Sequence, residues 1–511
     1  MASPEDIRTH ADTRRTVAII SHPDAGKTTL TEQLLKVTDT IGRAGAVNSK
    51  GNRKATVTDW MEMEQERGIS VVSSAVRIHV DGITINLLDT PGHGDFSEDT
   101  YRVLSAVDSA VMLLDAAKGI EPQTRRLFEV CRARQLPIIT FVNKIDRPSM
   151  DAMEMLDHVE KELDLQVVPM TWPAGDAASF AGVVHPEDAG RDIRELAPWE
   201  ARGFQEHEWD DAVDTLELAQ GAAGGFDREA FLAGDLTPMF FGSAANMFGV
   251  DHLVAAMREL APAPAPRADR NGDPRPIEEA FSAHVFKLQA NVDQRHRDVA
   301  AYMRICSGAF TRGDKVSIAR TGRPIVMNRA VEPFGQDRAT VEEAWPGDVI
   351  VLPGSRDLRI GDTVHAGKLV EFPHITTFAP HLFRQLSNRD IARRKQFQQG
   401  ISQLGDEGVV QIYIDPKVGI QTPIAAAVGE LQYEVFTHRM ANEFGVEVGL
   451  SQLPLAISVA WDEKNEGTPP RATGMRVLES THGIQLLAFG SDWALANYRK
   501  DHPELLLHDV L

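Results

Sequence analysis

The sequence is poor in cysteine and has no long apolar run. Only Cys131 and Cys306 occur in 511 residues, which gives no support to a disulfide framework or a thiolate metal site. Both lie among apolar residues, so we expect buried, reduced thiols. No apolar run reaches the roughly 18 residues of a transmembrane helix, and the stretch MASPEDIRTHADTRR lacks the apolar core of a signal peptide. We therefore expect a cytoplasmic protein without a membrane partner.

Basic charge is also in deficit. The chain has 53 Lys and Arg against 74 Asp and Glu, which gives a net charge of −21. A field of this sign does not draw nucleic acid to the protein as a whole, so we do not expect DNA binding. A local basic face that docks on RNA stays open, because net charge says nothing about single patches.

Short β-rich runs alternate with helical patterns in the first half of the chain. The runs lie at 16–20, 83–88, 110–114, 137–142 and 238–241. Such alternation predicts a mostly parallel sheet with helices on both faces, in a domain at 1–262. Asp81-Gly82, between a run at 76–80 and the run at 83–88, predicts one antiparallel hairpin. Residues 171–236 are long for a connection and predict an inserted subdomain.

The remainder predicts two further parts, since 511 residues suggest about three domains. A proline-rich stretch at 263–277 predicts an extended linker. Short strands with turn signals at 278–372 predict a β-barrel, and mixed helices and strands at 373–511 predict a C-terminal α/β domain. One helix there is expected to end at Gly405 and Gly408. The expected fold class is therefore multidomain α/β plus β.

The stretch SHPDAGKTT, residues 21–29, lies between a predicted strand and a predicted helix. In that context a loop of this kind turns backbone N–H groups and a helix N-terminus towards phosphates. Lys27 would reach the β- and γ-phosphates, and the Thr28 hydroxyl would bind Mg²⁺. The usual first glycine is replaced by a small serine, which we interpret as a tolerated variant. The residues expected to contact the nucleotide are Ser21, His22, Pro23, Asp24, Ala25, Gly26, Lys27, Thr28 and Thr29.

A second motif follows the run at 83–88. It reads Asp89-Thr90-Pro91-Gly92, and these residues are expected to lie at the nucleotide. Asp89 would hold Mg²⁺ through a water molecule. The Gly92 N–H would meet the γ-phosphate and make this segment sensitive to its presence.

Two more motifs predict which base is bound. Asn143-Lys144-Ile145-Asp146 ends another strand, and its carboxylate can accept from N1–H and N2–H₂ of guanine. Adenine has neither donor and would leave the carboxylate unpaired. Ser243-Ala244-Ala245 follows the last strand, where a backbone N–H could meet guanine O6. All four motifs occur at strand ends, where open α/β sheets bind ligands, so the sequence predicts a GTP and GDP site.

Three segments resemble the ribosome-dependent translational GTPases of the elongation factor family. They are DWMEMEQERGIS at 59–70, DTPGHGDFSEDTYR at 89–102 and NKIDR at 143–147. Within that group, SHPDAGKTT, DWMEME and GDFSEDTYR resemble the branch that acts in termination. The resemblance covers almost the whole chain and is looser after 370. It implies a nucleotide domain, a barrel and a smaller α/β domain.

The resemblance also implies roles for single residues. His93 matches the histidine that orients the attacking water and is the expected catalytic residue, while Ser70 matches a Mg²⁺ ligand. Ile69 and Pro23 match an apolar gate around that histidine. Gly94 departs from the larger or acidic residue of some relatives. The chain shows no arginine finger in cis, so slow unassisted hydrolysis is expected, with the ribosome completing the site.

The function implied by the resemblance is ribosome-stimulated hydrolysis of GTP to GDP and phosphate. It would drive class-I release factors off the ribosome after peptide release, and the protein is expected to be a monomer. The basic run NRDIARRKQ at 388–396 is either a solvated helix face or a contact to ribosomal RNA.

Two alternatives stay open from the sequence. One is another translational GTPase, of elongation or rescue, and the other is a GTP-regulated binding switch off the ribosome. Because about 140 residues follow the predicted barrel, with room for about one domain, a translocating factor is not expected.

Overall fold

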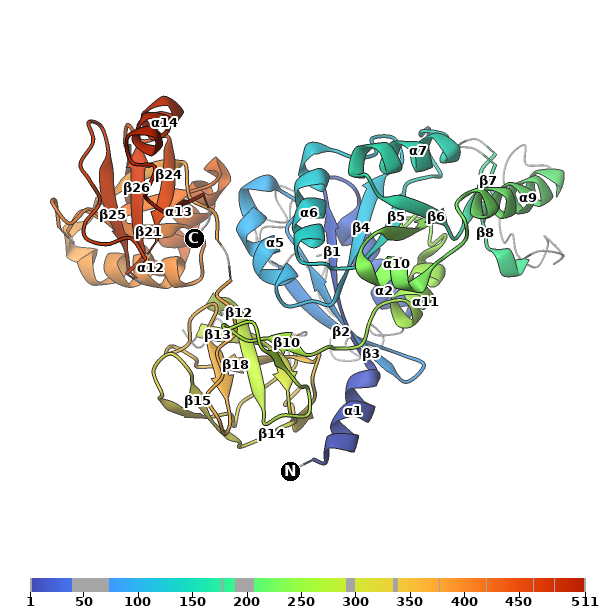
Figure 1. The fold of residues 1–511 in the computed structure, drawn as a ribbon, viewed down its shortest axis with the longest axis horizontal. Coiled ribbons are helices and arrows are strands. Elements are labelled where there is room, and N and C mark those ends of the chain that lie inside the picture. The colour runs from blue at the N-terminus through green and yellow to red at the C-terminus, as the bar shows by residue number, and fades with distance from the viewer. Residues whose placement is uncertain are drawn as a thin grey trace.

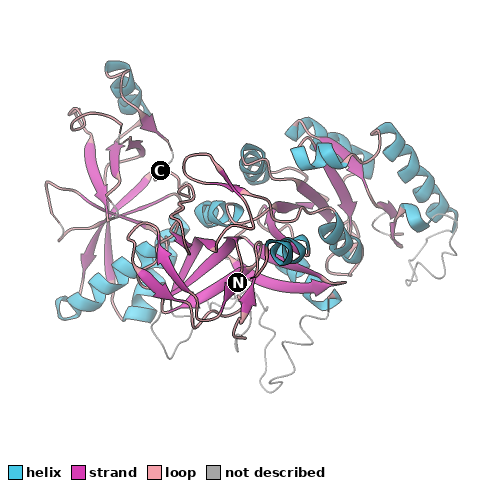
Figure 2. Ribbon diagram, turned by 60° about the horizontal axis from the view of Figure 1, so that its bottom comes forward, coloured by secondary structure: helices cyan, strands magenta, loops and turns pink. Residues whose placement is uncertain are grey.

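Three sheets of different composition organise the molecule (Figure 1). The computed structural model describes residues 2–38, 73–175, 177, 179–188, 206–290, 299–333, 339–375, 377–419, 421–462, 464–481 and 483–509. The first and last sheets are accompanied by helices, whereas the middle one, drawn at the bottom of Figure 1, is built from strands. Figure 2 shows the same division by secondary structure.

The first sheet has seven strands in the order β2-β3-β1-β4-β5-β9-β6, and only β2 pairs antiparallel. Its strands are β1 (Arg14–Ser21), β2 (Ser74–Val80), β3 (Ile83–Asp89), β4 (Ser109–Asp115), β5 (Ile138–Asn143), β6 (Gln166–Pro169) and β9 (Leu236–Phe241). The surrounding helices are α2 (Lys27–Val37), α5 (Ser97–Leu104), α6 (Pro122–Ala133), α7 (Ala152–Leu163) and α11 (Val250–Glu259), with the short 3₁₀ helix η1 (Gly94–Phe96) before α5. The predicted, mostly parallel sheet and the β2–β3 hairpin are thereby confirmed.

Side-chain alternation along β1 explains why helices cover both faces. Val17 and Ile19 point into a core shared with α2 and α11, whereas Ala18 and Ile20 join the core of α5, α6 and α7. All four are fully buried. A strand buried on both faces needs a continuous apolar run, which is what residues 17–20 supply.

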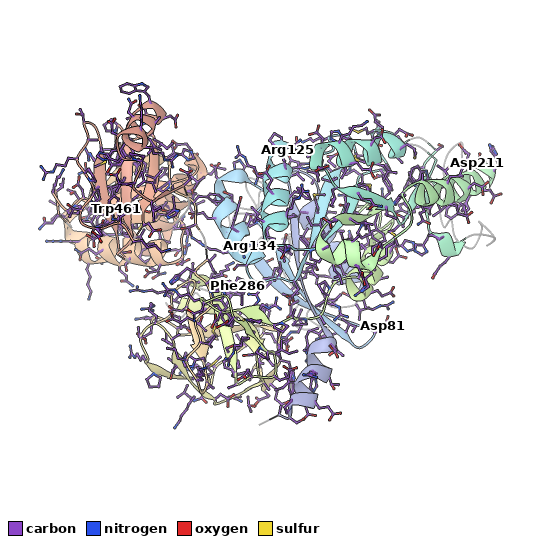
Figure 3. All side chains as sticks on the ribbon, in the orientation of Figure 1. Asp81, Arg125, Arg134, Asp211, Phe286 and Trp461 are labelled. Atoms are coloured by element: carbon purple, nitrogen blue, oxygen red, sulfur yellow. The ribbon has the colours of Figure 1, made fainter. Side chains whose placement is uncertain are left out.

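The domain also contains one helix that the sequence patterns did not predict, and elements within the insertion predicted at 171–236. Helix α1 (Pro4–Asp12) precedes β1, and its N-terminus is a capping box in which Ser3 and Asp6 bond reciprocally. The inserted residues after β6 hold β7 (Trp172–Ala174), β8 (Gly182–Val184), η2 (Pro186–Asp188), α9 (Glu206–Ala222) and α10 (Arg228–Ala233). In Figure 3 Asp211 marks α9 at the far end of this insertion.

The linker is not extended throughout. β10 (Arg267–Ala268) and β11 (Pro274–Arg275) pair as a small hairpin. The Asp269 carboxylate accepts from the N–H groups of Asn271 and Asp273, which closes the turn. The hairpin begins directly after the alternating prolines at 262–266, so the turn at Asp269 lies outside the stretch that those prolines stiffen.

The middle domain is β-rich, as predicted. Its main sheet has the order β16-β15-β19-β12-β13-β18 and curves as a half-barrel, with a two-stranded pair β14-β17 beside it. The strands are β12 (Ser282–Ala290), β13 (Val299–Ser307), β14 (Phe310–Thr311), β15 (Lys315–Ile318), β16 (Pro324–Val326), β17 (Glu343–Ala344), β18 (Val349–Pro353) and β19 (Thr363–His365). In Figure 3 Phe286 lies where this domain meets the first one.

The C-terminal domain combines an eight-stranded sheet with three α-helices among its described residues. The strand order is β23-β20-β22-β21-β25-β26-β24-β27. Bounds are β20 (Leu382–Asn388), η3 (Ile391–Arg393), α12 (Arg394–Asp406), β21 (Gln411–Ile414), β22 (Ile424–Ala427), α13 (Glu430–Phe444), β23 (Val448–Gln452), β24 (Ile457–Trp461), β25 (Arg476–Ser480), β26 (Gln485–Phe489), α14 (Asp492–Asp501) and β27 (Leu507–His508). The predicted α/β domain is confirmed.

One helix end differs from the prediction. Helix α12 runs through Gly405 and ends at Asp406, while Gly408 follows it with φ +76°. A Cβ on Gly405 would lie 2.8 Å from Ile412 of β21. This glycine therefore serves close packing within the helix, and only Gly408 has the left-handed conformation of a helix terminator.

The cysteine prediction is confirmed, because Cys131 and Cys306 are both free and buried. Burial raises the pKa of Cys131 to about 12. Of the helices in the described ranges, none is long and apolar enough to cross a membrane.

Candidate functional site

The predicted nucleotide motifs follow four strands of the first sheet. The phosphate loop follows β1, the Asp89 motif ends β3, the Asn143 motif ends β5, and the Ser243 motif follows β9. These strands run parallel, so their carboxyl ends share one edge of the sheet. The structure therefore brings the four motifs to one place, as the sequence predicted.

The phosphate loop has the backbone shape of an anion cradle. Asp24 has φ +66° and Gly26 has φ +95°, directly before α2 begins at Lys27. Left-handed residues before a helix N-terminus turn successive N–H groups towards one point. The tight loop also explains Gly26, because a Cβ there would lie 2.5 Å from the Asn143 amide nitrogen.

Lys27 and Asp89 form a buried ion pair beside this loop. The Lys27 ammonium donates to Asp89 Oδ1 over 2.6 Å, and both side chains are more than nine-tenths buried. A buried cation next to a phosphate cradle fits the β- and γ-phosphates, and the oxygen donors of Asp89 and Thr28 are of the type that Mg²⁺ prefers. These residues fit a Mg–nucleotide complex, although their roles stay predictions.

His22 lies inside the loop and is buried. Its Nδ1 is 3.2 Å from the Thr124 hydroxyl, and its Nε2 is 3.5 Å from a Glu121 carboxylate oxygen. Burial lowers the pKa of His22, with a smaller opposing influence from Glu121. These contacts fasten the loop to the start of α6, so the structure supports a positioning role for His22.

Asn143 connects three of the four motifs. Its amide nitrogen donates to the Ala25 carbonyl over 2.8 Å, and its carbonyl oxygen accepts from the Ala244 N–H over 2.8 Å. Asn143 itself is 3% exposed. It therefore holds the phosphate loop and the Ser243-Ala244-Ala245 segment at a fixed separation.

Lys144 braces the same region from its outer side. It has φ +69°, and its ammonium donates to the Asp24 carbonyl over 2.5 Å and to Asp115 Oδ2 over 2.8 Å. Burial works against ionisation of Asp115, but the hydrogen bond and charge of Lys144 hold the pKa of Asp115 below its usual value. Asp115 was not predicted from the sequence; its position at the end of β4, between two predicted motifs, was the available signal.

Asp146 has the feature expected of a base-reading carboxylate. Asn246 donates to its Oδ2 over 2.9 Å, whereas Oδ1 is buried and has no hydrogen-bond partner among the described residues. An unpaired buried carboxylate oxygen is costly unless a ligand completes it. Two adjacent ring donors of guanine would do so. Asn246 is a second residue that was not predicted from the sequence.

The remaining predicted residues divide into two groups. Thr90 lies under the loop edge and donates to the Ile19 carbonyl over 2.7 Å, and the backbone of Ile145 donates to the Gly242 carbonyl. Ser70 and Ile69 lie outside the described residues, as does the rest of 59–70. Across the described ranges, no group of three or more His, Cys, Asp or Glu side chains is gathered as a metal site.

His93 precedes the 3₁₀ helix η1. Its Nδ1 accepts from the Asp95 N–H over 3.3 Å, and its ring contacts Phe96 at 6.3 Å between centroids. The side chain is 36% exposed, so the ring is held by its own loop and is accessible.

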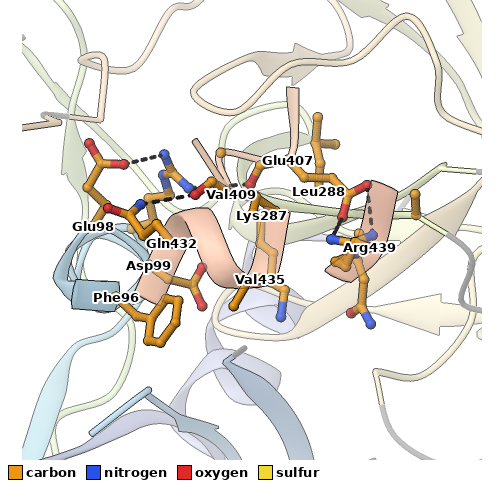
Figure 4. Close-up of a pocket in the computed structure, with 14 residues that line it drawn as sticks. Phe96, Glu98, Asp99, Lys287, Leu288, Glu407, Val409, Gln432, Val435 and Arg439 are labelled. Atoms are coloured by element: carbon orange, nitrogen blue, oxygen red, sulfur yellow. Dashed lines mark hydrogen bonds and ion pairs between the residues drawn. The ribbon is translucent and has the colours of Figure 1, made fainter. Parts of the chain in front are cut away.

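The helix after η1 packs against the C-terminal domain. A cavity of about 60 Å³ lies between α5, β12 and the C-terminal domain, lined among others by Phe96, Glu98, Lys287 and Arg439 (Figure 4). Glu98 is 2% exposed, and burial raises its pKa despite the neighbouring Arg102. The segment that carries His93 thus touches another domain directly.

Comparison with known families matches each part of the chain. The model described as "Elongation factor Tu GTP binding domain" matches 12–263, "Elongation factor G domain 2" matches 280–367, and "Class II release factor RF3, C-terminal domain" matches 372–499.

Curated relatives match over the full length. "Peptide chain release factor 3" of Synechococcus elongatus is 44% identical and covers 99% of this chain and 94% of its own. The protein of the same name from Gloeothece citriformis is 43% identical over 97% of this chain and 95% of its own. A crystal structure of a protein from Thermus thermophilus has a TM-score of 0.67 at 23% identity, covering 92% of this chain and 71% of that one, and shows the fold alone.

Proposed function

The chain belongs to the peptide chain release factor 3 family, and from this premise we propose how it works as a GTPase of translation termination. It hydrolyses GTP on the ribosome and uses the cycle to drive class-I release factors off after the peptide has been freed. The observation that carries the proposal is a guanine-type site, with its unpaired Asp146 oxygen, in one chain with a release-factor C-terminal domain. The protein acts as a cytoplasmic monomer.

The chemistry is phosphoryl transfer to water. The water oxygen bonds to the γ-phosphorus while the bond from that phosphorus to the bridging oxygen breaks. GDP leaves with the electron pair, and the water's protons end on solvent and phosphate. Catalysis is mostly positioning and charge stabilisation. Thr28, Ser70 and, through water, Asp89 would hold Mg²⁺, which would supply positive charge to the phosphates when bound.

The residues of the chain divide this work. Lys27 shifts from Asp89 to the phosphates, and the Gly92 N–H reports whether the γ-phosphate is present. His93 orients the attacking water once the ribosome completes the site. In the free protein its ring is bonded to its own loop through the Asp95 N–H, which fits slow idle hydrolysis.

The decisive experiment is GTP turnover with and without ribosomes that carry a class-I release factor. Strong stimulation together with faster factor release supports the proposal. Stimulation without effect on the release factor would point to an elongation or rescue GTPase, and turnover indifferent to ribosomes would point to a switch elsewhere. The release-factor C-terminal match disfavours both alternatives.

Base choice has its own test. Asp146→Asn should weaken GDP binding and gain xanthosine diphosphate, because the amide donates where xanthine offers an oxygen. Titration with both nucleotides measures this. Unchanged GDP affinity would remove Asp146 from the site.

A further inference from the structure

Helix α13 of the C-terminal domain has no side chain of its own at its N-cap. That position is Gly429, with extended φ −142°. The Leu431 N–H, two residues on, donates instead to Asp95 Oδ2 over 2.9 Å, across 336 residues of sequence. An N-cap side chain normally accepts from this N–H. Asp95 therefore caps α13 from the nucleotide domain.

Gly429 is shaped to receive this carboxylate. A Cβ at Gly429 would overlap the Asp95 side chain, whereas the extended backbone itself accepts any residue. The missing side chain at Gly429 therefore makes room for Asp95, and the backbone conformation of α13 does not itself require a glycine there.

Neighbouring contacts hold the same two surfaces together. Phe96 packs on Val435 of α13, and the Gln411 amide donates to Glu98 over 2.5 Å. The Arg102 guanidinium donates to the Glu407 carbonyl over 3.4 Å. Together these contacts clamp η1 and α5 to the C-terminal domain.

Asp95 also touches His93. Its N–H donates to His93 Nδ1, and its Oδ1 lies 3.5 Å from the same nitrogen, while Oδ2 is on Leu431. One residue thus joins the expected catalytic ring to the N-terminus of α13. A shift of α13 acts on this loop through Asp95 and through Phe96, which packs on Val435.

We propose that Asp95 is a positioning residue that ties His93 to the C-terminal domain through the cap on α13. With the cap closed, His93 is kept in its loop and idle hydrolysis is slow. When α13 moves away, the Asp95 carboxylate loses its partner and the His93 segment is freed. This inference rests on the role of His93 in the proposed function.

The cap can be broken from either domain. Gly429→Ala adds the clashing Cβ without changing the nucleotide domain, and Asp95→Ala removes the carboxylate. Asp95→Asn keeps an oxygen that can accept from Leu431 and should restore wild-type behaviour. Gly221→Ala, on α9 where a Cβ meets nothing within 4 Å, is the matched glycine control.

Two measurements on the full chain decide the matter. The first is the distance between spin labels at Lys161→Cys and Trp493→Cys, whose native side chains are 75% exposed while the native cysteines are buried. The second is ribosome-free GTP turnover. Both alanine variants should shift the distance distribution and raise kcat about 2-fold to 30-fold, the range for one helix cap, with KM little changed. The double variant should show no further gain.

Each other outcome overturns the inference. Wild-type distances in both alanine variants would mean that the cap does not hold the domains. Shifted distances with unchanged turnover would break the link to His93, as would an effect of Asp95→Ala that Gly429→Ala does not share. The distance measurement needs no ribosome, so failure of ribosome stimulation in the wild type would count against the proposed function and not against the cap.

Discussion

The nucleotide domain meets its two neighbours in different ways. Towards the β-rich domain the contact is a continuous core, in which Phe286, Tyr302 and Val351 belong to the same buried cluster as Val103 and Leu104. Towards the C-terminal domain the apolar contacts are smaller: Phe96 and Val435 form a separate cluster next to a cavity, and Tyr101 packs edge-to-face on Phe378 at 4.4 Å between ring centroids.

The polar contacts at the two interfaces also differ. At the first interface Arg304, with a side chain 1% exposed, pairs with Asp108 over 2.6 Å, and the Thr16 hydroxyl donates to the Gly347 carbonyl over 2.7 Å. At the second, the bonds are a helix cap, an amide contact to Glu98 and a long bond from Arg102.

The difference indicates which interface can open. Separating the first would expose apolar core to water and break a buried ion pair, and the lost apolar burial makes that costly. Separating the second exchanges hydrogen bonds for water at little net cost. We therefore expect the nucleotide and β-rich domains to move as one unit, and the C-terminal domain to move against them.

The largest effect is expected from His93→Ala, which removes the group expected to orient the attacking water. Ribosome-stimulated hydrolysis should fall by about 10²–10⁴, the typical worth of a positioned acid–base group, with GTP binding retained. Single-turnover hydrolysis with saturating ribosomes measures the rate, and co-sedimentation checks ribosome binding. Wild-type hydrolysis would make His93 a structural loop residue.

Arg304→Met tests the interface between the nucleotide domain and the β-rich domain. It leaves Asp108 without its partner and should lower the free energy of unfolding by about 3–5 kcal/mol in urea denaturation. The control is Arg312→Met, whose exposed pair with Glu342 is expected to contribute about 0–1 kcal/mol. Equal costs for the two variants would contradict the comparison.

Arg102→Met tests the interface between the nucleotide domain and the C-terminal domain. It removes the bond to the Glu407 carbonyl and the 3.4 Å pair with buried Glu98, and it should cost less than Arg304→Met because Glu98, whose pKa is raised by burial, can take up a proton. It should nevertheless shift the distance between labels on the nucleotide and C-terminal domains. A cost as large as that of Arg304→Met, with no change in distance, would reverse the assignment of the two interfaces.

The smallest effect concerns pH. Burial raises the pKa of Glu98 when the C-terminal domain is docked on α5. The Glu98 carboxyl therefore binds a proton more tightly when these domains are closed than when they are apart. Closure of the C-terminal domain should therefore be strongest at pH values at or below the usual pKa of glutamate, and it should weaken as pH rises through the raised pKa. Label distances at several pH values would show this slope, and Glu98→Gln should abolish it. A slope retained in that variant would assign it to another group.

Much of the fold followed from local patterns. Apolar runs such as residues 17–20 predict parallel strands, because a strand covered on both faces has to be apolar throughout. The departures had local causes as well. Helix α1 depends on a capping box, the linker hairpin on one aspartate, and the passage of α12 through Gly405 on a close approach to β21.

The nucleotide motifs were determined by the sequence itself, since phosphate, Mg²⁺ and guanine each demand given residue types at strand ends. For that reason, the roles of Asn143 and Asp146 could be predicted from their pattern alone. Only the tertiary structure decided how the site is braced and controlled. Asn246 was not predicted, and Asp115 had only its place at the end of β4 as a signal. The cap of Asp95 on α13 carries no sequence signature, because a carboxylate and a glycine so distant in the chain become partners only when separate domains pack.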